Sequence, residues 1–184
     1  MTRISKSKSR RGAETLEFTL ALLPLLIMTF VLLDVAWAVF VKNTLAYAVR
    51  AGLRVGITAT GTQAKVAGPG GTASDLTSMV KATVQNNALG LLKGATGLAK
   101  IKVHYFLPPA PSSTAGLTDV STLSSGDTPL NVMQVSVQGF SLSPLVPRVF
   151  SWTHAPDTAA TNINAIAADL IEPSRDVPPI GAAP

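Results

Sequence analysis

The chain contains no cysteine, so neither disulfide bonds nor thiolate metal sites can form. Its two histidines, His104 and His154, lie far apart and have no third ligand type at metal-binding spacing. It has no phosphate-binding glycine motif, no Gly-x-Ser-x-Gly sequence and no paired acids for acid–base chemistry. Its many Ser and Thr residues have no candidate base to activate them. We therefore expect no metal, no cofactor, no small-molecule substrate and no enzymatic activity.

Acidic residues are absent from the first twelve positions, where five basic residues lie: Arg3, Lys6, Lys8, Arg10 and Arg11. From residue 13 onward, ten basic residues are balanced by ten acidic ones, so the net charge of +5 comes from the N-terminal segment. A neutral body has no electrostatic footprint for phosphate backbones, and we expect no nucleic-acid partner. Basic residues that flank a membrane helix hold that end in the cytoplasm.

A long apolar run follows this basic segment. Phe18 to Val41 comprises 24 residues with one charge, Asp34. A helix of that length covers about 36 Å, enough to cross a hydrocarbon core of about 30 Å with some tilt. A secretory signal peptide is the competing interpretation, with Ala46 to Ala48 as an imitation of a cleavage site, but its apolar region is usually only about 7–15 residues long. The run therefore predicts a membrane anchor whose C-terminal body lies outside the cytoplasm.

Three residues within the run have special chemistry. Pro24 removes one backbone donor, and it either kinks the helix for packing or is simply tolerated there. Asp34 either faces a partner inside the membrane or lies near the outer boundary, where it needs none. Trp37, near the end of the run, is typical of an interfacial anchor.

Beyond Val41 the helix is predicted to continue to about Ile57 as an amphipathic extension. Small residues recur every four positions and form one stripe: Thr44, Ala48, Gly52 and Gly56. Such a stripe lets another backbone approach closely. The partner is either the body of the chain itself or a sister subunit, and the pattern does not choose between them. Arg50 and Arg54 lie roughly opposite the stripe and can face water.

The start of the apolar helix carries a second pattern. Gly12 is followed by Ala13, Glu14 and Glu17, with Phe18 next to Glu17. If the chain is cut after Gly12, the new amine of Ala13 lies one helical turn from Glu17, and the two opposite charges can neutralise each other. The alternative is that both glutamates only occupy a first turn that the helix dipole favours.

A short basic leader, a glycine, a glutamate five residues later and a long apolar helix resemble the type IV prepilin family. More closely, RRGAETLEFTLALLPLL followed by NTLAYAVRAGLRVGIT resembles the TadE-like pseudopilins of tight-adherence (Flp-type) pilus systems. The residues that carry the resemblance are Gly12, Glu17, Phe18, Leu23 to Leu25, Asp34, Arg50 and Arg54.

The resemblance implies a function and partners. A prepilin peptidase would cut between Gly12 and Ala13 on the cytoplasmic side, and Glu17 would help to place the subunit beside a neighbour's new amine. The partners implied are the membrane, that peptidase, other pilin or pseudopilin subunits and the pilus assembly machinery. The location implied is the bacterial inner membrane, with one pass and the body in the periplasm or in the pilus.

The remaining sequence predicts a small body. Asp75 or Ser74 can cap a helix whose apolar residues run from Leu76 to Leu91, and Gly90 and Gly94 would end it. Alternation predicts strands near residues 101–107 and 133–137, separated by a long loop at 108–130. Residues 161–171 satisfy both helical and strand spacing, and the resemblance favours a strand that closes the sheet before Glu172. We interpret Trp152 as an ordinary core or surface residue, and we expect residues 140–149 to form an extended connector.

These elements predict an α+β protein: a long N-terminal transmembrane helix that extends into an amphipathic helix, then a small domain with one helix and an antiparallel sheet of about three strands. The expected segments are a basic leader (1–12), the helix (13–57), an extracytoplasmic domain (58–172) and a disordered tail (173–184). The leading functional hypothesis is a TadE-like minor pilin processed after Gly12. Two others stay open: an unprocessed single-span adaptor or assembly factor, and an enzyme or ligand binder without a recognisable motif.

Overall fold

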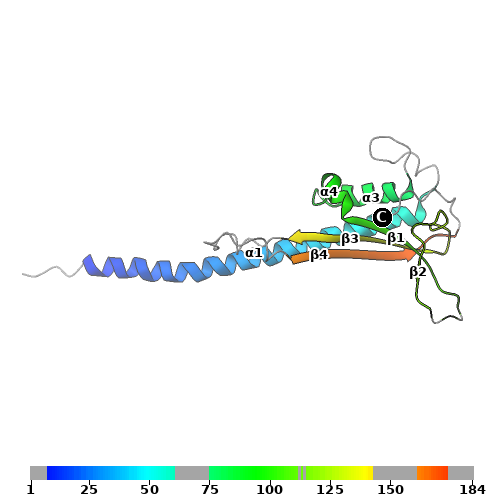
Figure 1. The fold of residues 1–184 in the computed structure, drawn as a ribbon. Helices are drawn as coiled ribbons and strands as arrows, with labels where there is room; N and C mark the ends of the chain where they lie inside the picture. The colour runs from blue at the N-terminus through cyan, green and yellow to red at the C-terminus, as the bar shows by residue number, and fades with distance from the viewer. Residues whose placement is uncertain (1–7, 61–74, 112, 114, 143–160, 174–184) are drawn as a thin grey trace, which may run out of the picture. The chain divides into compact units, whose positions relative to one another are not determined.

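The computed structural model describes residues 8–60, 75–111, 113, 115–142 and 161–173 (Figure 1). These residues fall into two compact units. The first unit holds the described residues 8–39, and the second holds those of 40–142 and 161–173. Helix α1, Lys8–Thr58, contributes residues to both units. It begins within the basic segment, earlier than the predicted start at Ala13, and its end agrees with the predicted end near Ile57.

In the first unit, residues 8–39 are helical and their large apolar side chains are exposed. Phe18 is 67% exposed, Leu20 65% and Met28 66%. The hydroxyls of Thr19 and Thr29 donate to carbonyls one turn earlier in the helix, at 2.7 and 2.8 Å, so neither needs water. Among the described residues, Gly12–Thr58 is the one helix with the length and composition to cross a membrane, and its mean hydropathy reaches 2.3.

In the second unit, the C-terminal part of α1 has a buried stripe. Val41, Leu45, Ala48 and Val49 are fully buried, and they repeat at helical spacing. Helix α3, Leu76–Asn87, begins where the Asp75 carboxylate accepts a hydrogen bond from the backbone N–H of Ser78 at 2.6 Å. A short helix, α4, spans Gly94–Ala99.

The end of α3 agrees with the prediction only in part. The helix was expected to end at Gly90 and Gly94, but it ends earlier, at Asn87. Leu89 and Gly90 adopt left-handed backbone conformations, with φ of 49° and 80°, and these terminate the helix. Leu91 therefore packs against the core from the turn that follows α3, not from the helix itself.

The sheet is antiparallel, with strand order β2-β1-β3-β4. Its strands are β1 (Ile101–Leu107), β2 (Thr118–Asp119), β3 (Val132–Leu142) and β4 (Thr161–Leu170). The predicted α+β class is confirmed, but the sheet has four strands where about three were expected. The additional strand is β2, which lies in the segment 108–130 that shows no periodicity. The strand favoured at 161–171 is confirmed as β4.

One face of the sheet forms the core. Val103, Tyr105, Met133 and Val135 are each at most 1% exposed. Figure 1 shows α3 and the C-terminal part of α1 on the same side of the sheet. Side chains on the opposite face are more open, and Ile166 is 60% exposed. The predicted connector at 140–149 is wrong for residues 140–142, because β3 extends to Leu142 and pairs there with β4. The rest of the connector, Trp152, His154 and the tail from residue 174 lie outside the described residues.

Candidate functional site

The predicted processing segment lies on the exposed surface of α1. Gly12, Ala13, Glu17 and Phe18 are all helical and exposed. A methyl group added to Gly12 would meet no atom within 4 Å, so packing among the described residues does not require a glycine there. If a glycine is needed at position 12, the reason is therefore a contact with another molecule and not packing within this chain.

The residues singled out within the apolar run occupy different environments. Pro24 lies inside α1, among exposed leucines. Asp34 is half-buried, and Trp37 is 45% exposed. Val41, the predicted end of the run, is fully buried, whereas Val39 is 53% exposed. Val41 thus takes part in the hydrophobic core of the second unit.

The small-residue stripe of α1 packs against the chain's own body. Ala48 is fully buried. A methyl group on Gly52 would overlap the Val84 side chain of α3 and lie 3.3 Å from the backbone oxygen of Val80. A methyl group on Gly56 would lie 2.8 Å from the Val80 side chain and would also press on Met133 of β3. Within this chain the stripe therefore packs against α3 and β3.

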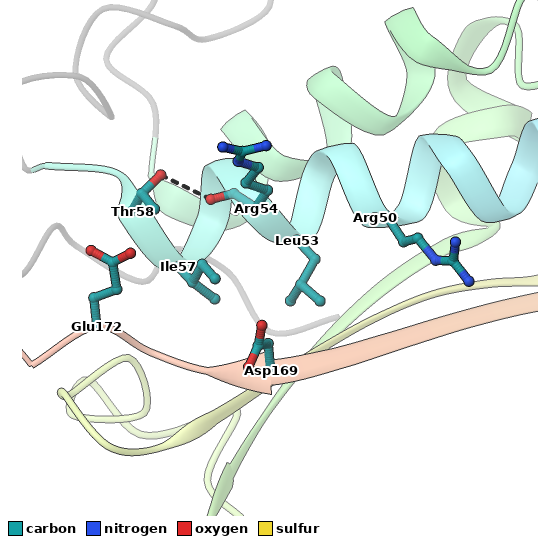
Figure 2. Close-up of a pocket in the computed structure, with 7 residues that line it drawn as sticks. All are labelled: Arg50, Leu53, Arg54, Ile57, Thr58, Asp169 and Glu172. Atoms are coloured by element: carbon teal, nitrogen blue, oxygen red, sulfur yellow. Dashed lines mark hydrogen bonds between the residues drawn. The ribbon is translucent and has the colours of Figure 1, made fainter.

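The exposed side of α1 borders a groove in the second unit that carries both signs of charge. Arg50 and Arg54 lie on α1, Asp169 near the end of β4, and Glu172 just beyond it. The groove has a volume of about 400 Å³, and its other lining residues are Leu53, Ile57 and Thr58. Figure 2 shows the side chains of Leu53 and Ile57 pointing from α1 toward the side on which Asp169 lies. We call this set of seven residues the charged groove.

Backbone contacts hold the two walls of the charged groove together. The N–H of Glu172 donates to the Ile57 carbonyl of α1 at 3.5 Å. The adjacent Ile171 is fully buried, and its N–H donates to the Asn131 carbonyl at 2.9 Å. On the helix side, the Thr58 hydroxyl donates to the Arg54 carbonyl at 2.8 Å (Figure 2). The backbone on both sides of the charged groove is therefore hydrogen-bonded close to the charged residues.

The four charged side chains of the groove do not neutralise one another. Among the described residues, the ion pair within 4 Å is that of His104 and Asp119, and it lies elsewhere on the sheet. The Asp169 carboxylate instead accepts a hydrogen bond from the N–H of Leu170 at 2.8 Å. Two cations and two anions thus remain available to a partner. Arg50 and Arg54 were recognisable from the sequence, but Asp169 was not. Asp169 lies beside α1 only because β4 pairs with β3.

His104, Asp119 and Ser121 form a polar cluster at β1 and β2. The Asp119 carboxylate accepts a hydrogen bond from the Ser121 hydroxyl at 2.5 Å and lies 3.4 Å from His104 Nδ1. The hydrogen bonds from Ser121 hold the pKa of Asp119 below its usual value, and His104 lowers it further. The carboxylate stands between the serine and the histidine, so the histidine cannot take the serine proton as it does in a catalytic triad. The cluster instead fixes the strand pairing, since Ser121 also accepts from the Tyr105 N–H at 2.9 Å.

Within the described residues, no group of three or more His, Cys, Asp or Glu side chains could hold a metal ion. The described residues combine a helix that has the length and composition to cross a membrane with a small α+β unit whose surface carries the charged groove.

One family model matches the N-terminal part of the chain. Residues 12–54 match the family model described as TadE-like protein. The resemblance found in the sequence is thereby confirmed over this segment, which begins at Gly12 and ends at Arg54. No curated protein and no solved structure shows significant similarity to the chain. Residues 12–54 are thus similar to TadE-like proteins, and they lie within the helix that has the length and composition to cross a membrane.

Proposed function

We propose that the chain is a TadE-like minor pilin or pseudopilin, anchored in the bacterial inner membrane by α1 and processed by a prepilin peptidase after Gly12. The observation that carries this proposal is the family match, which begins at Gly12, directly after the five basic residues of the N-terminal segment. The matched residues lie in helix α1, which has the length and composition to cross a membrane. A leader of twelve residues, a helix and an extracytoplasmic body then follow as the segments of the proposed subunit.

The geometry at Gly12 suits a peptidase. Cleavage of the peptide bond between Gly12 and Ala13 requires an extended backbone, so the first turns of α1 must open locally. Glycine is about 1 kcal/mol less favourable than alanine within a helix, which makes opening easier at this point. Because Gly12 and Ala13 are exposed and Gly12 has no packing neighbours, opening disrupts no side-chain contact there.

The charge distribution supports one orientation. The basic segment before Gly12 would remain in the cytoplasm, and the second unit would lie on the opposite side of the membrane. The peptidase would then cut at the cytoplasmic end of the helix. Glu17, the fifth residue of the processed chain, would lie one turn from the new amine of Ala13. Assembly would use this carboxylate to position a neighbouring subunit.

The test is to replace Gly12 by a bulky residue and follow the size of the membrane-bound chain. Gly12→Leu should abolish the loss of twelve residues and reduce piliation, while the chain still inserts into the membrane. Gly116→Leu is a matched control, since a methyl group added to Gly116 would also meet no atom within 4 Å, and Gly116 lies far from the helix start in sequence. If the parent protein shows no size shift to abolish, the chain is an unprocessed single-span adaptor instead.

A further inference from the structure

The charged groove has the properties of a self-complementary contact surface, one that can bind the same groove on a second copy of the chain. It carries two cations, Arg50 and Arg54, on one wall and two anions, Asp169 and Glu172, on the other. Opposite charges on two sides of one patch become complementary when the patch meets a copy of itself through a two-fold axis. Each arginine wall then faces the acidic wall of the other copy. A partner with one sign of charge would instead be repelled by half of the groove.

We propose that the charged groove is a homotypic interface, in which two copies of this chain pair Arg50 and Arg54 of one with Asp169 and Glu172 of the other. Leu53 and Ile57 lie between the two walls and supply the apolar contact. Leu53 is only 6% exposed and Ile57 is partly buried, so the apolar part is small. The charges therefore set the register of the pair more than its strength.

Membrane anchoring makes such a small contact sufficient, and this step rests on the proposed function. A helix anchored in a bilayer confines every copy to one plane, which raises the effective concentration of one groove for another. Each exposed charge pair contributes little to binding in solution, so a set of four pairs holds two copies together only when the copies are already close. The interface would therefore form between anchored subunits and dissociate easily in solution.

The test measures association of the full chain in liposomes by energy transfer between labelled copies. The chain has no cysteine, so Ala95→Cys, at an exposed position on α4, gives one labelling site. The R50E/R54E variant has an entirely acidic groove, and the D169K/E172K variant an entirely basic one. Each should associate with itself about tenfold more weakly than the parent chain does. K93E/K102E changes the net charge as much as R50E/R54E outside the groove and should have no effect.

Two combinations of variants should restore association, and they distinguish loss of the interface from misfolding of the variants. An equal mixture of R50E/R54E and D169K/E172K should associate as well as the parent, because acidic and basic grooves then meet. The variant with all four reversals should also associate with itself, because both signs are present again. Salt should weaken association of the parent, because exposed charge pairs are screened. If a reversed variant fails to fold, judged by circular dichroism, R50Q/R54Q replaces it with the same expected loss of association.

Equal association of the parent and both double variants overturns the proposal, as does a parent that inserts but remains monomeric at every surface density. So does failure of both recoveries in variants that are folded. Flotation of the liposomes checks insertion separately. A chain that does not insert contradicts the proposed function, whereas a chain that inserts without pairing contradicts only the homotypic interface.

Discussion

Gly52 of α1 lies so close to Val84 of α3 that the two helices leave no room for a methyl group between them. The backbone oxygen of Val80 limits the same space at 3.3 Å and cannot move as a side chain can. This contact joins the helix that carries the family match to the body of the chain. Its close approach explains why a helix tolerates a glycine that costs about 1 kcal/mol in propensity.

Gly52→Ala should therefore destabilise the body although alanine is the better helix former. Overpacking a core costs typically about 1–3 kcal/mol, which exceeds the gain in propensity. Gly56→Ala is the matched comparison and should cost less, because the flexible end of Met133 faces it. Thermal unfolding of the full chain in detergent, followed by circular dichroism, measures both. A higher melting temperature for Gly52→Ala than for the parent contradicts the close contact.

Acid should weaken the body through Asp119. Its pKa is lowered in the folded chain, chiefly by the Ser121 hydroxyl, so the carboxylate contributes stability above its unfolded pKa of 3.8. That contribution is lost as the pH falls from about 3.8 through the lowered folded value. Asp119 is 52% exposed, so the effect is small.

Ser121→Ala tests this assignment, because it removes the main cause of the shift. The melting temperature of the variant should be lower than that of the parent at pH 7, and the difference should shrink between pH 5 and pH 2. Asn131→Ala is a control of similar kind, since Asn131 Nδ2 donates to the Gly126 carbonyl at 2.9 Å and does not titrate. A difference for Ser121→Ala that is constant with pH argues against the role of Asp119.

Lys81 on α3 should limit the stability of the body. Partial burial lowers the pKa of its ammonium group, and the nearby Lys102 lowers it further. A lysine with a folded pKa below its unfolded value of 10.5 weakens folding at neutral pH, and the penalty fades as the pH rises toward 10.5. Lys81→Met should raise the melting temperature by a few degrees at pH 7. The gain should be smaller at pH 10, and an unchanged gain would point to packing as the cause.

Glu17 should be needed for assembly and not for insertion. Glu17→Ala should leave the chain in the membrane and processed, yet reduce the number of pili at the cell surface. Glu14→Ala is the matched control, because it removes an acid from the same exposed turn without removing the proposed partner of the new amine. Normal piliation in Glu17→Ala would remove the reason to assign Glu17 this role.

The sequence predicted an element best where the environment of that element is uniform along its length, as in an apolar helix or a strand with one buried face. The apolar run from Phe18 predicted a membrane-compatible helix, and strict alternation predicted β1 at residues 101–107 within one residue. It was less informative where tertiary contacts decide. Gly90 was expected to end α3, but the helix ends earlier, at Asn87, because Leu89 also adopts a left-handed backbone conformation. Nothing in the apolar spacing indicates that conformation for a leucine.

The charged groove shows the same limit at a candidate site. Arg50 and Arg54 were visible as exposed basic residues at helical spacing. Asp169 and Glu172 lie more than a hundred residues away in the chain, and only the pairing of β4 with β3 brings them beside α1. The partner of the stripe at Gly52 was undecided for the same reason, since small residues permit close approach without specifying what approaches.

The central claim is that the membrane-bound chain is a processed subunit that has been cut after Gly12, within the first turns of α1. Peptide mass mapping of the N-terminus of the native membrane form tests it most directly. We predict a mature chain that starts at Ala13, with residues 1–12 absent. A mature chain that retains the basic leader, or one cut after Ala48 beyond the apolar run, would contradict the claim.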